Sequence, residues 1–367
     1  MQLTSSRPEA RRVLEVAAIA LVAVVALCGY WFAAVAGNQP RSDDGNGRPI
    51  STMYHPPRHD VERALDRGDG QIYAALATDP AVRDPGIVTG PAAEEAYRYQ
   101  RPGYGWLAWV ASAGRRDAVE WALIVLTSLS VVGLIAITAR WLIDRQQDPR
   151  FALLLLVAPG VLVNLLWIGP EALGTLLVMV GLRRMVPPGG STRLRSMGVV
   201  AFACLAAAGL CRESLLLIPA TLAVLGLTQR RWRTAIGLAA TALPYAGWVL
   251  VLHARIGAWP VGSVPGRLAA FPFAGMVHGL TTAGSVEAAF AVVTLGIAVA
   301  ALALGREPII RLLIATNLAF ASMMGTAVWH RFDGFGRVLL PMTVFSLVSI
   351  VPALAHRRAE VLDVQPA

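Results

Sequence analysis

The chain has 367 residues, of which 56% are hydrophobic and only 15% are charged. Soluble globular proteins carry about 25% charged residues, so the composition excludes an ordinary soluble domain and favours an integral membrane protein. The formal net charge is +9, and every basic residue is an arginine because the chain contains no lysine. The arginines are dispersed over short segments, which argues against the single basic face of a nucleic-acid-binding protein.

Ten apolar segments follow one another along the chain. A transmembrane helix needs about 20 mostly apolar residues, and shorter ones occur inside a bundle. The segments are residues 13–36, 118–139, 151–168, 171–186, 197–211, 214–228, 234–253, 286–304, 309–328 and 338–355. The sequence therefore predicts an all-α integral membrane protein with about ten transmembrane helices. Its parts are an N-terminal segment 1–12, a first helix 13–36, a long loop 38–117, a nine-helix bundle 118–355 with an outer loop 254–285, and a tail 356–367.

The distribution of arginine predicts the orientation. If the N-terminus is cytoplasmic, the short cytoplasmic loops hold 14 arginines and the short loops on the other side hold 5. Because cytoplasmic loops are enriched in basic residues, we expect a multi-pass plasma-membrane protein with both termini in the cytoplasm and the loop 38–117 outside. The first apolar run has 24 residues, longer than the roughly 7 to 15 of a signal-peptide core, so a retained helix is favoured over a cleaved signal.

Cysteine and histidine spacing predicts no metal site. Cys28, Cys204 and Cys211 fall inside predicted membrane segments and lack metal-ligand spacing. His55 and His59 are four apart, but two prolines lie between them and break the helix that would bring them together. The sequence neither indicates nor excludes a divalent cation as a cofactor.

The long loop contains two segments that suit chemistry. Residues 68–80 predict a short helix, with glycine-flanked Asp69 at its start and Pro80 at its end. Residues 96–106 combine tyrosines and a tryptophan, which suit a membrane interface, with Arg98 and Arg101, which suit a phosphate group. Asp69 is also well placed to act only as the N-cap of the helix beginning at Gly70.

These residues resemble the first outer loop of GT-C fold glycosyltransferases. The resemblance rests on five short stretches: Asp69-Gly70-Gln71-Ile72-Tyr73, Tyr97-Arg98-Tyr99-Gln100-Arg101, the outer turn at Glu171, the Arg212-Glu213 turn, and Arg337 to Pro341. It implies mannosyltransferase-like transfer of a sugar, with inversion, from a polyprenyl-phosphate donor to an extracytoplasmic glycan, glycolipid or protein acceptor. It also implies that a loop aspartate acts as the base, in the synthesis of the cell envelope.

Asp69 takes the position of the family's first loop acid. Many members have two adjacent acids, whereas Gly70 follows Asp69 here, so Asp43, Asp44 and Asp66 remain alternative bases. The candidate substrate-binding residues are Gln71, Tyr73, Arg98, Tyr99, Arg101, Glu171, Arg212, Glu213, His330, Arg331 and Arg337.

Several of these residues also have simpler explanations. Arg98 and Arg101 could extend to lipid headgroups, and Glu171 could stabilise the positive end of the helix that follows it. An Arg331 to Asp333 contact would make the last outer turn an interfacial anchor. Arg212 and Glu213 lie between two helices, where charges are costly unless they are paired or face a watery cavity; the cavity is the favoured interpretation.

Two other classes of function stay open. A transporter or lipid flippase would be favoured by inverted repeats or charges deep within helices, and the sequence shows neither clearly. A non-catalytic subunit of an envelope-assembly complex would use the long loop as an interaction surface. The chain has no phosphate-binding glycine loop or dinucleotide fingerprint, so nothing in it supports the use of ATP or a nucleotide sugar.

Overall fold

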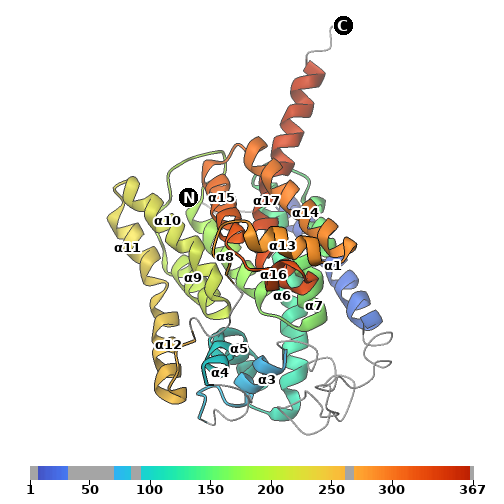
Figure 1. The fold of residues 1–367 in the computed structure, drawn as a ribbon. Helices are drawn as coiled ribbons and strands as arrows, with labels where there is room; N and C mark the ends of the chain where they lie inside the picture. Colours follow the sequence, from blue (N-terminus) through green and yellow to red (C-terminus); the bar gives the residue numbers. More distant parts are fainter. Residues whose placement is uncertain (1–6, 32–69, 84–91, 261–267, 364–367) are drawn as a thin grey trace.

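The computed structural model describes residues 7–31, 70–83, 92–260 and 268–363, and this part of the chain is helical, without strands (Figure 1). Its α-helices are α1 (Arg7–Trp31), α3 (Gly70–Thr78), α4 (Ala92–Tyr99), α5 (Pro102–Ala111), α6 (Val119–Ile143), α7 (Pro159–Trp167), α8 (Glu171–Met185), α9 (Val199–Cys211), α10 (Leu217–Thr228), α11 (Trp232–Ala240), α12 (Leu243–Ile256), α13 (Ala274–Thr282), α14 (Ser285–Leu304), α15 (Pro308–Ser322), α16 (Thr326–Trp329) and α17 (Phe332–Asp363). The described residues also form the 3-10 helices η3 (Arg116–Ala118), η4 (Pro149–Val157) and η5 (Glu213–Leu216).

The structure supports a multi-pass all-α membrane protein. Within the described residues, five helical stretches are long and apolar enough to cross a bilayer, or six if one bent pair is counted as a single span. The five are Pro8–Trp31, Arg116–Ile143, Trp232–Ile256, Ser285–Leu304 and Phe332–Arg357. The other predicted segments coincide with shorter helices; α8, for example, has 15 residues and is about 22 Å long at about 1.5 Å per residue, less than the roughly 30 Å hydrocarbon core. The count of ten spans therefore stays a prediction.

The third predicted segment is broken, although its sequence reads as one apolar run. It consists of η4 and α7, which are bent by 59° at Ala158. Pro159 explains the break, because proline has no N–H to donate to the preceding turn and disfavours helical backbone in the residue before it. Ala158 accordingly has extended backbone angles, and Pro159 begins α7.

The main hydrophobic core surrounds α17. This helix packs against α7, α14 and α15, while α8 packs between α6 and α9. Large buried side chains fill the space, among them Trp141, Trp329, Phe335 and Phe345. Because α17 is buried over most of its length, it can hold residues at both ends of the bundle in fixed positions.

A second, smaller core attaches α3, α4 and α5 to one end of the bundle, the end opposite the C-terminus (Figure 1). Tyr73 of α3 meets the Tyr104 ring of α5 edge to face, with the ring centroids 5.2 Å apart. The Tyr104 hydroxyl donates to the Leu123 carbonyl of α6 at 2.7 Å, and Trp248 Nε1 of α12 donates to the Tyr99 carbonyl at 2.9 Å. The segment after Gly70 is thus packed onto the membrane helices.

Candidate functional site

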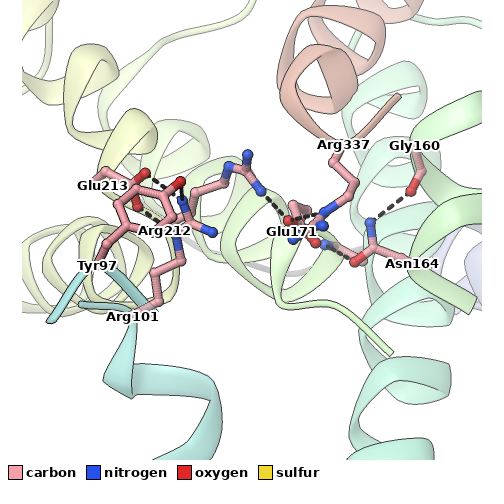
Figure 2. Close-up of polar contacts among 9 residues, drawn as sticks. Tyr97, Arg101, Gly160, Asn164, Glu171, Arg212, Glu213 and Arg337 are labelled. Atoms are coloured by element: carbon pink, nitrogen blue, oxygen red, sulfur yellow. Dashed lines mark hydrogen bonds and ion pairs between the residues drawn. The ribbon is translucent and has the colours of Figure 1, made fainter. Parts of the chain in front are cut away.

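Charged residues gather where helices begin or end, next to α3, α4 and α5. Arg101 precedes α5, Glu171 is the first residue of α8, and Arg337 lies near the start of α17. Arg212 and Glu213 occupy the break between α9 and η5. Figure 2 shows these five side chains converging from four separate parts of the chain. We call them the charge network.

Glu171 is the centre of the charge network. Its side chain is only 1% exposed, and its Oε1 accepts hydrogen bonds from both Arg212 Nη1 and Arg337 Nε, the latter at 2.7 Å (Figure 2). Two arginines on one buried carboxylate compensate its charge, and removing water from such ions would otherwise cost several kcal/mol for each. Glu171 therefore fixes two guanidinium groups that reach it from different helices.

Asn164 holds the start of α8, and Gly169 leaves room for the Glu171 side chain. Asn164 Oδ1 accepts from the N–H of Ala172 at 3.0 Å, while its Nδ2 donates to the Gly160 carbonyl at 2.7 Å (Figure 2). This amide joins α7 to the first turn of α8, whose N–H groups have no partner inside the helix. A Cβ at Gly169 would collide with Glu171 Oε2, so a residue without a side chain is required there.

Arg101 and Glu213 form the second part of the charge network. Arg101 donates from Nε and Nη2 to the two carboxylate oxygens, both at 2.7 Å. Its Nη2 also donates to the Tyr97 hydroxyl at 3.0 Å, and the guanidinium lies 5.3 Å from the centre of the Tyr97 ring. The Arg101 side chain is 8% exposed and that of Glu213 is 30% exposed, so this pair lies nearer the surface than Glu171.

The composition of the charge network suits an anion. It contains three arginines and two glutamates, so these five groups carry one more positive than negative charge. Within the described part of the chain, Arg212 Nε is a buried donor without a hydrogen-bond partner; Glu171 Oε2 is also unpartnered, but as a carboxylate oxygen it accepts and does not attract an anion. Arginine's planar fork of donors matches phosphate and carboxylate oxygens.

Other predicted binding residues lie apart from the charge network. Tyr73 and Tyr99 are buried packing residues of the smaller core. Arg98 pairs with Glu94 one turn earlier on α4, at 2.6 Å and partly exposed to solvent. Gln71 lies on α3, and its Oε1 is buried without a hydrogen-bond partner among the described residues.

The last predicted outer turn includes His330, Arg331 and Asp333 and lies at the start of α17, where His330 borders a separate cavity. Arg331 donates to Asp333 at 3.0 Å, the contact named in the alternative interpretation of this turn, and its guanidinium lies 5.7 Å from the centre of the Trp167 ring. His330 lines a cavity of about 560 Å³ between α13 and α16.

The proposed base lies outside the residues that the structure describes. This holds for Asp69 and for the alternatives Asp43, Asp44 and Asp66, as well as for His55 and His59. The helix expected after Asp69 is present, since α3 begins at Gly70. Among the described residues, no group of three or more histidines, cysteines or acidic residues is placed to hold a metal ion.

Sequence reasoning missed two residues of this region. Asn164 is fully buried, and its signal was present: a single amide within an otherwise apolar segment has to find partners. Tyr97 was noticed only as part of an aromatic segment, because its contact with Arg101 depends on the angle between α4 and α5.

Similarity to known proteins does not add to this picture. No family model, curated protein or solved structure matches the chain. The function has to be argued from the charge network and from the sequence of the loop beside it.

Proposed function

We propose that the protein is a membrane glycosyltransferase that moves a sugar from a polyprenyl-phosphate donor to an acceptor on the extracytoplasmic side. The observation that carries the proposal is the convergence of Arg101, Arg212 and Arg337 on two glutamates, at the end of the bundle where α3 to α5 dock. A lipid-linked donor carries its phosphate at the membrane surface, and a cluster of positioned arginines is suited to that group.

The position of Asp69 in the sequence supports the same reaction. It directly precedes Gly70, the first residue of α3, and α3 packs against α5, which follows Arg101. In the reaction, an acceptor oxygen forms a bond to the anomeric carbon, and the bond from that carbon to the phosphate oxygen breaks. The acceptor proton passes to the Asp69 carboxylate, and the polyprenyl phosphate leaves with the electron pair. A positioned general base contributes typically about 10² to 10⁴-fold to the rate.

The first test compares two aspartates of the same predicted outer segment. Detergent-purified wild type, Asp69→Asn and Asp117→Asn are incubated with a panel of radiolabelled polyprenyl-phosphate sugars and membrane-derived acceptors. Asp117 is the matched control, because its side chain is 69% exposed and pairs only with the equally exposed Arg115 among the described residues. We expect Asp69→Asn to lose about 10² to 10⁴-fold in turnover while donor binding persists, and Asp117→Asn to act like wild type.

Two results would argue against this assignment. Full turnover by Asp69→Asn would move the role of base to Asp43, Asp44 or Asp66. Failure of folded wild type to bind any polyprenyl-phosphate sugar would remove the transferase proposal and favour an assembly subunit, which co-purification with a stable partner would then identify.

One observation favours a transporter or flippase as the second candidate. The 59° bend between η4 and α7 resembles the broken helices that line substrate sites in secondary transporters. The charge network, however, lies at helix ends rather than midway along α8 or α17. Translocation of a labelled lipid-linked sugar across liposomes by purified protein, without transfer to an acceptor, would establish the second candidate.

A further inference from the structure

The second half of the predicted outer loop 254–285 does not have the composition of a loop in water. From residue 268 to residue 286 the sequence contains no aspartate, glutamate, lysine or arginine, whereas a soluble surface carries about 25 to 35% of these residues. Four large apolar side chains of this stretch are nevertheless exposed, each by between 55% and 73%: Leu268, Phe271, Phe273 and Val277. An exposed patch of this kind marks contact with another protein or with a membrane.

The segment lies at the height of the membrane. It is followed at once by the span Ser285–Leu304, and its helix α13 packs against α16. Helix α16 comes after α15, which has 15 residues and starts beside the charged residues Arg306 and Glu307. At about 22 Å, α15 ends about 8 Å short of the opposite edge of a roughly 30 Å hydrocarbon core. Helices α13 and α16 therefore lie where the bundle is too short to reach the bilayer surface, and Figure 1 shows α13 lying across the bundle while α17 runs along it.

The non-helical residues before α13 bond their backbone groups to the protein. The N–H of Ala269 donates to the Met323 carbonyl at 2.8 Å, and the N–H of Phe273 donates to the Ser322 carbonyl at 2.6 Å. Non-helical backbone is tolerated at membrane depth only where its polar groups are satisfied within the protein or face a water-filled cavity. The segment thus meets a requirement that lipid imposes and that a loop in water does not have to meet.

Helix α13 has one side against the protein and one side exposed. Gly275 and Gly279 form the protein side, where a Cβ on either would collide with residues of α16 or next to it; small residues allow such close approach between membrane helices. On the exposed side, the Thr281 hydroxyl donates to the Val277 carbonyl at 3.0 Å, so it has a partner without water. His278 is exposed and is the one ionisable side chain between residues 268 and 286, which suits the level of the headgroups rather than the bilayer centre.

We propose that residues 268–282 form an interfacial segment and that lipid of the leaflet beside the charge network covers its exposed apolar side chains. Helix α16 leads directly into α17, which carries Arg337, so the segment and the charge network lie on the same side of the membrane. The exposed apolar surface continues along the chain into α14, where Val286 is 63% exposed, and α14 is long and apolar enough to cross the bilayer. This continuity favours lipid over a partner protein as the occupant. Interfacial helices bury their apolar side about 5 to 10 Å into the boundary between headgroups and acyl chains.

The accessibility of nitroxide spin labels, measured by EPR on the full-length protein in phosphatidylcholine nanodiscs, tests the proposal. In a background without the native cysteines, Phe271→Cys and Val277→Cys are labelled one at a time. Val293→Cys of α14, at a position 57% exposed, is the lipid-facing control, and Ser191→Cys, exposed and outside the candidate spans, is the water-facing control. Oxygen concentrates among acyl chains, whereas a nickel chelate stays in water. We expect the ratio of oxygen contact to nickel-chelate contact at residues 271 and 277 to be severalfold higher than at residue 191 and close to that at residue 293.

A second measurement needs only the wild-type protein, so it stands even if a labelled variant does not fold. The nanodiscs contain phosphatidylcholine with a diazirine on one acyl chain, and mass spectrometry maps the crosslinked peptides after illumination. We expect crosslinks within residues 268–282 as well as within Ser285–Leu304. Nickel-chelate contact at residues 271 and 277 equal to that at residue 191 would place the segment in water and overturn the proposal. Little contact with either reagent, together with crosslinks in α14 but none in residues 268–282, would show that protein covers the segment and would overturn lipid as its occupant.

Discussion

The buried carboxylate of Glu171 joins three parts of the chain, because Arg212 and Arg337 both bind it. It is the first residue of α8, a place where an acid is favourable to the helix dipole. In the structure it bonds instead to Arg212 and Arg337. Removing it would leave two guanidinium groups buried together without their shared partner, and their mutual repulsion would add to the cost.

We therefore expect Glu171→Gln to lower the free energy of unfolding by about 3 to 5 kcal/mol, the range for breaking a buried ion pair from one side. Thermal unfolding of detergent-purified protein measures the change. The matched control is Asp117→Asn, which breaks an exposed pair worth about 0 to 1 kcal/mol. Equal melting temperatures for Glu171→Gln and wild type would show that Glu171 does not stabilise the two arginines.

The sequence identified the members of the charge network but not their pairing. Arg212 and Glu213 are adjacent, yet Arg212 pairs with Glu171 and Glu213 pairs with Arg101, 41 and 112 positions away. This pairing explains how Arg212 and Glu213, which the sequence predicted to face a watery cavity, are tolerated between two apolar helices. A local pattern shows that a charge between two helices needs compensation, but the partner depends on how distant helices pack.

Helices α7 and α17 approach closely because glycines lie at their contact. A Cβ at Gly160 would meet the Gly336 carbonyl and Leu340, and a Cβ at Gly336 would lie 3.2 Å from the Pro159 carbonyl carbon. Gly336 precedes Arg337, so the separation of the two helices also sets the position of one arginine of the charge network.

We predict that Gly160→Val forces α7 and α17 apart and destabilises the protein by about 1 to 3 kcal/mol, as overpacking does elsewhere. The matched control is Gly296→Val in α14, where a Cβ has no neighbour within 4 Å. Both changes replace a helical glycine with the same residue, so the difference between their unfolding midpoints isolates the contact. Equal midpoints would mean that the helices adjust without cost.

At the scale of the whole molecule, the charge network lies at the start of α8, and the segment that contains Ser191 follows the other end of that helix. Asp117 and Ser191 are exposed and belong to these two ends in the predicted topology. In a background without Cys28, Cys204 and Cys211, we expect a membrane-impermeant maleimide to label Asp117→Cys in intact cells. We expect it to label Ser191→Cys only after the membrane is permeabilised. Labelling of both from the same side would refute the predicted arrangement.

The sequence alone determined that this is a helical membrane protein, because burial in lipid requires long apolar segments whose backbone groups bond within the helix. It also determined which charged residues stand out, since a charge at a helix break in apolar surroundings is conspicuous. Only the tertiary structure decided that Pro159 bends one segment, that Asn164 joins α7 to α8, and that Glu171 holds Arg212 and Arg337. Those features depend on contacts between residues far apart in the chain, and the hydrophobic periodicity of a single helix does not specify which helices will meet.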